Sequence, residues 1–211
     1  MRTVLYKIGG SLLSDSSLFN RLDAYLSQRE EDEFPLLLFG GGPVVDVVRG
    51  YDKQYGLGEE SSHQLALQGM ELNAALAVDR LPKAFPVYSA MELEVARRKL
   101  TGRPVLFVCS LIEELEEHKE LEQNPNGLLP PTWNTTSDSI AAWLTQKLRL
   151  DELRLVKSIT APVWQELKSG TSLAVDPEFS NWLDGIPDLT WLDFQTESEL
   201  VYLKSSTGKL G

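Results

Sequence analysis

Cysteine, histidine and basic side chains are scarce in this chain of 211 residues. Its single cysteine, Cys109, cannot form an internal disulfide, and two histidines cannot assemble a zinc site. Lysine and arginine number 20 against 31 acidic residues, a formal net charge of −11, and the longest basic cluster is Arg97-Arg98-Lys99. This balance argues against binding to nucleic acid or to an anionic membrane, and it favours a small molecule or a protein as partner.

Long apolar runs are also missing. No run approaches the ~18 residues that a membrane span needs, and the N-terminus lacks the apolar core of a secretory signal. We therefore expect no membrane association and a cytoplasmic location. Length and ordinary globular composition favour one compact domain, with two lobes, 1–150 and 151–211, sharing a core.

Short β-like runs alternate with longer helical runs along the chain. This alternation predicts a layered α/β fold with a largely parallel sheet. The segment 63–78 predicts a helix capped by Ser61-Ser62, with small and apolar residues on more than one side, as in helices that line a core or an interface. Strands are expected at 3–8, 35–39, 104–109 and 153–157, and Cys109, at the end of an apolar run, is expected in the core.

Two of the predicted strands end in glycines. Strand 3–8 leads into Gly9-Gly10-Ser11, and strand 35–39 leads into Gly40-Gly41-Gly42. Glycine lets the backbone approach an anion closely, and a following helix N-terminus supplies unpaired N–H groups. Both loops could hold phosphate, with Lys7 adding a positive charge, although glycines in such turns can equally serve the fold alone.

Sharper phosphate-binding motifs are absent. No G-x-G-x-x-G follows the first strand, and Ser206-Thr207-Gly208-Lys209 lacks the upstream glycine and the trailing Ser or Thr of a Walker A loop. Ordinary Rossmann and P-loop assignments are therefore excluded.

Ser137-Asp138-Ser139 stands at the start of a predicted helix. By itself this segment indicates helix capping by Ser137 or Asp138. If Lys7 lies nearby, Asp138 could instead hold lysine ammonium groups where charge develops on a transferring phosphoryl group.

Taken together, the three segments resemble the amino acid kinase superfamily. The resemblance rests on Lys7-Ile8-Gly9-Gly10-Ser11-Leu12, then Gly40-Gly41-Gly42, then Thr136 to Ala141, in that order. It implies a three-layer α/β/α sandwich with a mainly parallel sheet. Within the superfamily the chain is most similar to the small kinases of methanofuran biosynthesis, over most of residues 3–157. That closer similarity includes Val47-Val48-Arg49, Ser62-His63, Trp133 and Val175-Asp176.

The resemblance implies roles for particular residues. Lys7, Asp138 and Lys157 would be catalytic, with Lys157 standing in for a second lysine that several relatives carry after a late Gly-Gly-Met. A solvent-exposed lysine at the strand end is the alternative for Lys157. Nucleotide or phosphate binding would involve Gly9, Gly10, Ser11 and Ser139, and substrate binding would involve Gly40, Gly41, Gly42, His63, Asn134 and Thr136. No metal-ligating side chain is expected.

The implied activity is that of an ATP-dependent, Mg²⁺-dependent small-molecule kinase. Its acceptor would be a phosphate monoester such as aminomethylfuran-methanol phosphate, in the biosynthesis of a methanofuran-type C1 carrier. Residues 1–150 would bind the acceptor and transfer the phosphoryl group, the shortened lobe 151–211 would bind the nucleotide, and the chain would form a homo-oligomer. A non-catalytic nucleotide- or anion-binding homologue, or a kinase of a carboxylate acceptor, are the alternatives.

Overall fold

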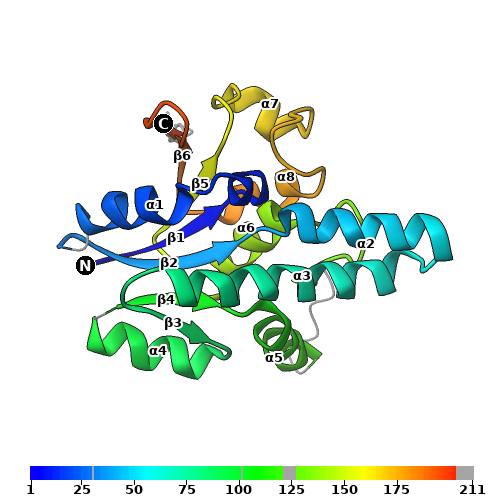
Figure 1. Ribbon diagram of the computed structural model, residues 1–211, viewed down its shortest axis with the longest axis horizontal. Helices are drawn as coiled ribbons and strands as arrows, with labels where there is room; N and C mark the ends of the chain where they lie inside the picture. Colours follow the sequence, from blue (N-terminus) through cyan, green and yellow to red (C-terminus); the bar gives the residue numbers. More distant parts are fainter. Residues whose placement is uncertain (30, 101, 121–126, 203–211) are drawn as a thin grey trace, which may run out of the picture.

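A seven-stranded sheet organises the computed structural model, which describes residues 1–29, 31–100, 102–120 and 127–202 (Figure 1). The strand order is β3-β4-β2-β1-β5-β6-β7, and β7 pairs antiparallel with β6 while the other neighbours pair in parallel. The strands are β1 (Arg2–Ile8), β2 (Glu33–Phe39), β3 (Ala84–Val87), β4 (Arg103–Leu106), β5 (Glu152–Lys157), β6 (Asp188–Asp193) and β7 (Ser198–Tyr202).

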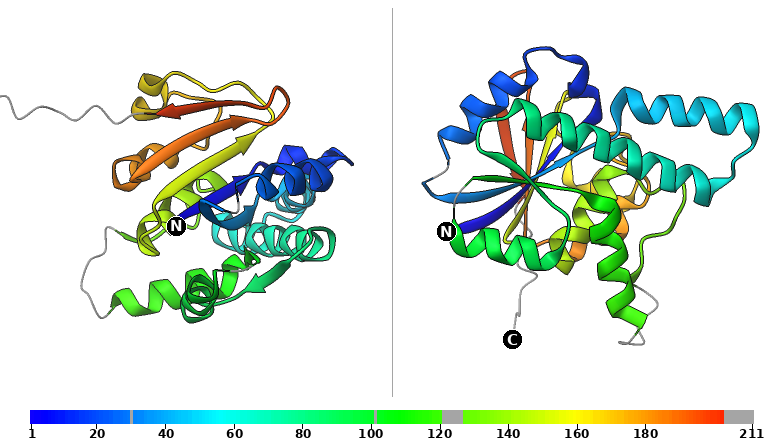
Figure 2. Two further views of the ribbon diagram at one scale, coloured as in Figure 1. Left: turned by 90° about the vertical axis from the view of Figure 1, so that its left-hand side faces the viewer. Right: turned by 60° about the horizontal axis from the view of Figure 1, so that its bottom comes forward.

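Helices cover both faces of the sheet, as Figure 2 shows. One face packs against α1 and the C-terminal half of α3, and the other packs against α4, α5, α6, α7 and α8. This arrangement confirms the predicted α/β/α sandwich. The helices are η1 (Gly10–Ser14), α1 (Leu18–Ser27), α2 (Gly42–Tyr55), α3 (Glu59–Arg80), α4 (Ala90–Lys99), α5 (Val108–Glu120), α6 (Ser137–Lys147), α7 (Trp164–Ser169), α8 (Phe179–Trp182) and η3 (Leu183–Gly185).

The central strand and α6 form the middle of the core. Every residue of β1 from Thr3 to Ile8 is buried, which explains why its sequence is nearly continuous in apolar residues, as in strands covered on both faces. Helix α6 is buried from Ser137 to Thr145. None of the helices in the described ranges is long and apolar enough to cross a membrane.

Two predicted element boundaries are wrong. Helix α3 begins at Glu59, with Gly58 at its N-cap, so Ser62 lies inside the helix. Strand β4 ends at Leu106, and Cys109 lies in the first turn of α5, where its N–H donates to Glu71 at 3.0 Å. The apolar run spans the end of a strand and the start of a helix, so Cys109 is half-buried rather than in the core, and burial raises the pKa of its thiol to about 12.

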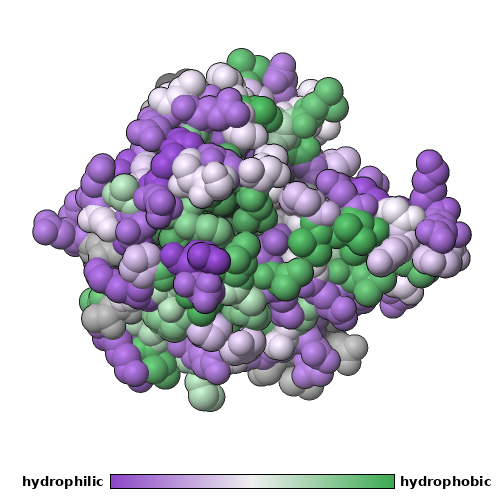
Figure 3. All heavy atoms as spheres, viewed as in Figure 1, coloured by the Kyte–Doolittle hydropathy of each residue, from purple (hydrophilic) through white to green (hydrophobic). Residues whose placement is uncertain are grey.

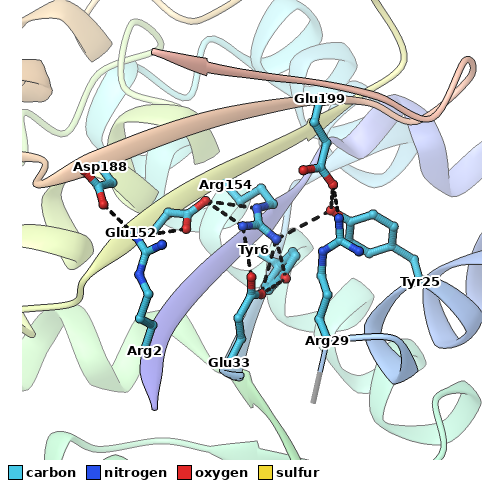
Figure 4. A network of polar contacts seen from close by, with 9 residues as sticks. All are labelled: Arg2, Tyr6, Tyr25, Arg29, Glu33, Glu152, Arg154, Asp188 and Glu199. Carbon is cyan, nitrogen blue, oxygen red and sulfur yellow. Dashed lines mark hydrogen bonds and ion pairs between the residues drawn. The ribbon is translucent and has the colours of Figure 1, made fainter. Parts of the chain in front are cut away.

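A buried polar network ties three neighbouring strands together (Figure 4). Arg154 on β5 donates to Tyr6 at 2.7 Å, to Glu152 at 2.8 Å and to Glu33 at 3.2 Å. The network therefore joins β1, β2 and β5 across the boundary expected near residue 150. Because one sheet continues through that boundary, both predicted lobes are built on the same layer of strands.

Candidate active site

The carboxyl ends of β1, β2 and β5 meet at one edge of the sheet. The chain passes from β1 to β2 on one side, and β5 is added on the other side of β1. In open α/β sheets such a reversal of strand order leaves a crevice beyond the carboxyl ends of the strands, where ligands bind. Lys7, Gly40 and Lys157 all lie at this edge, although 150 positions separate the first from the last.

The two glycine loops pack directly against each other. A Cβ atom on Gly10 would lie 2.3 Å from the backbone nitrogen of Gly42, and Gly42 itself has a φ of +49°. Only glycine permits this approach. Asn73 on α3 fixes the second loop by donating to the carbonyl oxygens of Gly40 and Gly41, both at 2.8 Å. The loops thus form a rigid cradle whose backbone is open to an anion.

Beneath the cradle, Asp138 lies between two lysines. Its carboxylate is 2.8 Å from Nζ of Lys7 and 2.6 Å from Nζ of Lys157, one oxygen to each. The three residues are at most 9% exposed, which excludes the solvent-exposed alternative for Lys157. The structure therefore brings together the three predicted catalytic residues from β1, α6 and β5.

The electrostatics of this cluster leave a net positive charge at neutral pH. Burial alone would raise the pKa of Asp138, but the ammonium groups of Lys157 and Lys7 outweigh it and lower that pKa to about 2. Burial also lowers the pKa of Lys157 to about 8, with Asp138 offsetting part of the effect. Asp138 is therefore an ionised anchor, and Lys157 is a cation that can lose its proton at mildly alkaline pH.

The start of α6 is capped in a way that the sequence did not indicate. Thr136 is the N-cap residue, and no side-chain cap comes from Ser137 or Asp138, so the capping interpretation of that segment is wrong. Asp176 caps the helix instead. Its carboxylate accepts from the N–H of Thr136 at 3.1 Å and from the Thr136 hydroxyl at 2.6 Å. It also accepts from the N–H of Ser139 at 3.1 Å and from the Ser139 hydroxyl. Asp176 lies 37 positions beyond Ser139, and no local sequence pattern predicts this long-range cap.

A cleft of about 480 Å³ opens beside the glycine cradle. Its apolar wall comes from Val45, Ala66, Leu67, Met70 and Ile140. Of the predicted binding residues, Gly10, Ser11, Gly41, Gly42, His63 and Thr136 line the cleft. Gly9 and Gly40 lie within the loops, behind the lining. Asn134 is exposed outside the lining, and Ser139 is buried against Asp176.

Three residues that we did not predict as site residues form the outer part of the cleft. The guanidinium of Arg49 lies 5.2 Å from the ring of Trp133 and pairs with Asp46 at 2.7 Å. Trp133 is anchored by a 2.9 Å hydrogen bond from its indole N–H to Asp52. Arg49 is the one lysine or arginine among the described lining residues. Arg49 and Trp133 are among the residues that carry the family resemblance, but only the structure shows that they line a cleft.

The fold and the site define the class of protein: an α/β/α sandwich with two facing glycine loops above a buried lysine–aspartate–lysine cluster. The model of the amino acid kinase family matches residues 2–160. The chain therefore belongs to the amino acid kinase family.

Known proteins and solved structures agree with this membership. The chain is 24% identical over 159 residues to [5-(aminomethyl)furan-3-yl]methyl phosphate kinase of Methanocaldococcus jannaschii, a match that covers 74% of this chain and 65% of the relative. The fold is similar to uridylate kinase from Archaeoglobus fulgidus, with a TM-score of 0.63 and 19% identity over 90% of this chain and 89% of that one. It is also similar to UMP kinase from Ureaplasma parvum, with a TM-score of 0.68 and 12% identity over 94% and 93% of the two chains.

Proposed function

We propose that this chain is an ATP-dependent kinase that phosphorylates a small phosphate monoester to its diphosphate. The observation that carries the proposal is the buried cluster of Lys7, Asp138 and Lys157 directly beneath the glycine cradle. Phosphoryl transfer needs positioning and positive charge more than covalent chemistry from the protein, and this cluster supplies both.

The proposed reaction is a direct transfer between two bound phosphates. An oxygen of the acceptor phosphate attacks the γ-phosphorus of ATP, the bond from that phosphorus to the β,γ-bridging oxygen breaks, and ADP leaves with the electron pair. A dianionic acceptor needs no proton removed, so no general base is required. Asp138 could not act as one, because its pKa of about 2 and its two ion pairs keep it an ionised anchor for the lysines.

The residues present fit ATP as a phosphate donor. The close backbone contact of Gly10 and Gly42 leaves no room for side chains in the cradle, so phosphate oxygens can approach the N–H groups there. The side chain of Ser11 contacts Ser158 at 2.9 Å, which links the cradle to the segment after β5, where we place the nucleotide. The described residues hold no group of three His, Cys, Asp or Glu suited to a metal, so Mg²⁺ would enter bound to the phosphates of ATP.

The cleft supports a compact, ring-bearing acceptor. Its apolar wall and Trp133 suit a small ring, while the glycines of the cradle that line it suit a phosphate. The relative from Methanocaldococcus jannaschii is named for such a molecule, a furan that carries a methyl phosphate and an aminomethyl group. We therefore propose aminomethylfuran-methanol phosphate as the acceptor, in methanofuran-type biosynthesis. Asp46 at the rim provides a carboxylate for the ammonium group.

Turnover with a panel of acceptors tests this proposal. The purified chain is incubated with ATP, Mg²⁺ and [5-(aminomethyl)furan-3-yl]methyl phosphate, UMP or N-acetylglutamate, and the products are followed by ³¹P NMR. We expect diphosphate signals from the furan phosphate. An acyl phosphate would instead support a carboxylate acceptor. No turnover in any mixture, together with no calorimetric heat on adding ATP, would support the non-catalytic homologue.

His63 is expected to contribute to acceptor binding as a neutral ring. It lines the cleft, and burial lowers its pKa, with a hydrogen bond to the backbone of Thr132 offsetting part of the effect. Replacing His63 with alanine should raise the KM for the acceptor roughly tenfold, the loss of about 1.5 kcal/mol, while the KM for ATP changes little. Because the ring is neutral, acceptor KM should not rise between pH 7 and pH 8. An unchanged acceptor KM in a folded variant would assign His63 to the core.

Activity should fall as pH rises through about 8. Lys157 has a pKa of about 8, and it contributes its charge to the transition state only while protonated. The kcat should therefore decline with one alkaline limb, which Lys157→Arg should move to higher pH, because a guanidinium keeps its proton. A flat profile to pH 9.5 in the wild type would contradict this role for Lys157.

We also propose that the chain forms a homo-oligomer through the outer faces of α2 and α3. Val47 and Tyr51 on α2 and Leu72 and Leu76 on α3 are 41–60% exposed, and Figure 3 shows apolar residues gathered over these helices. None of the exposed α3 side chains from Ser61 to Leu76 is charged. The uncharged surface of α3 suits a second copy, because two chains of net charge −11 repel each other elsewhere. Light scattering should show that the wild-type chain is an oligomer and that the Leu72→Glu variant is a monomer. A monomeric wild-type chain would refute the proposed homo-oligomer.

A further inference from the structure

The segment 172–176 connects two members of the buried cluster. The carbonyl oxygen of Ala174 accepts from Nζ of Lys157 at 2.9 Å, on the side of the cluster that belongs to β5. Two residues later, the carboxylate of Asp176 binds the first turn of α6, which carries Asp138. A single short stretch of chain is therefore bonded to Lys157 and to the residues that flank Asp138 at the start of α6.

The bonds of Asp176 bracket Asp138. One oxygen accepts from the N–H and hydroxyl of Thr136 and from the N–H of Ser139, and the other accepts from the hydroxyl of Ser139. The two clamped residues lie on either side of Asp138 in the sequence. The positive end of the α6 dipole further favours a carboxylate at this point. These bonds hold the residues on both sides of Asp138 in the first turn of α6.

We infer that Asp176 is a positioning residue for phosphoryl transfer, holding Asp138 where it can bind both lysines at once. This inference rests on the proposed function. It also assigns the start of α6 to the protein's own carboxylate, so that the phosphates of ATP are held by the glycine cradle and the lysines. The Asp138 carboxylate must reach Lys7 on one side and Lys157 on the other, and a shift on the order of 1 Å would break one of these contacts.

Two substitutions separate the geometric role of Asp176 from its charge. In Asp176→Asn the amide oxygen can keep the three bonds made by one carboxylate oxygen, and the NH₂ group can donate to the Ser139 hydroxyl. Asp176→Ala removes all four bonds. Glu178→Ala is the matched control, because Glu178 lies two residues away and bonds to Asn181 on the surface.

We expect Asp176→Ala to lower kcat roughly 10- to 100-fold while the KM values for ATP and acceptor change less than about threefold. Asp176→Asn should keep kcat within about threefold of the wild type at pH 7, and Glu178→Ala should leave it unchanged. In Asp176→Asn the alkaline limb of kcat should move to lower pH, because the negative charge of Asp176 helps to raise the pKa of Lys157. Without that charge, Asp138 still raises this pKa and Lys7 still lowers it. The ring of Trp191, 5.6 Å from Lys157, is uncharged.

Hydrogen exchange provides a measurement that does not depend on turnover. In Asp176→Ala, the amides of residues 138–140 should exchange at least tenfold faster, while those of β1 stay protected. A folded Asp176→Ala variant with wild-type kcat, or with unchanged exchange at these amides, would overturn the inference. If this variant does not fold, an Asp176→Asn variant whose amides at 138–140 stay protected but whose kcat falls at least tenfold at pH 7 would overturn it. An inactive wild type, or an active Asp138→Ala, would refute the proposed function instead, and the exchange result would still decide the role of Asp176.

Discussion

Replacing Asp138 with alanine is expected to lower kcat by a factor on the order of 10² or more. The carboxylate holds Nζ of Lys7 and Nζ of Lys157 at 2.8 and 2.6 Å, and without it the two ammonium groups would repel each other and move apart. The variant should also lose roughly 3–5 kcal/mol of stability, because two buried cations lose their partner. Initial rates and thermal melts on the same preparation measure the two effects.

Asp193→Ala is the control for this variant. Asp193 ends the neighbouring strand β6 and is 4% exposed, as Asp138 is, but it bonds to Gln195 and Thr160 rather than to the lysines. It should lose stability while keeping kcat near the wild-type value. Wild-type turnover in a folded Asp138→Ala variant would show that the phosphoryl-transfer site is elsewhere.

The same ion pairs give the stability a defined dependence on acid. The pKa of Asp138 is lowered from 3.8 to about 2 in the folded chain. The ionised Asp138 carboxylate therefore stabilises the folded chain fully above pH 3.8, and this stabilisation is lost as the pH falls toward 2. Acid unfolding of Asp138→Asn should lack this contribution.

Gly10→Ala is expected to have the second largest effect, with kcat/KM for ATP falling roughly 10²-fold. The added Cβ would lie 2.3 Å from the nitrogen and 2.7 Å from the Cα of Gly42, and both are backbone atoms that cannot rotate away. The two glycine loops would have to separate, which removes the cradle and costs about 1–3 kcal/mol of stability. Steady-state kinetics with varied ATP and a thermal melt measure these losses.

Gly50→Ala on α2 is the matched control, since a Cβ there meets nothing within 4 Å. Alanine favours a helix interior over glycine, so this variant should be as stable as the wild type or more so. If Gly10→Ala kept the wild-type kcat/KM for ATP, the facing loops would have no part in binding the donor.

Much of the fold could be predicted from local patterns. Strand β1 is buried on both faces, so its residues are apolar almost without a break, and glycines follow where it ends. The boundaries were harder, because an apolar run does not show where a strand stops: Val105 belongs to β4, whereas Val108 and Cys109 belong to α5. Likewise, Ser61-Ser62 has the composition of a cap, yet α3 starts earlier at Glu59.

The site was predictable where a residue's role follows from its neighbours in the sequence. Gly10 and Gly42 occur in runs of glycine after strands, and Lys7 precedes one of these runs, so their positions at a phosphate-binding edge could be inferred. Asp176 belongs to the similarity as part of Val175-Asp176, but its role could not be inferred in this way, because its hydrogen-bonding partners lie about 40 residues away.

The sequence by itself determined the α/β class, the two glycine loops and the kinase-like order of motifs, because each depends on residues that are close together in the chain. Only the tertiary structure decided which distant residues meet. Placing β5 beside β1 buries Lys157 against Asp138, and the return of the chain after α7 brings Asp176 to the start of α6. These contacts depend on sheet order and long-range packing, and no local preference of the residues involved specifies them.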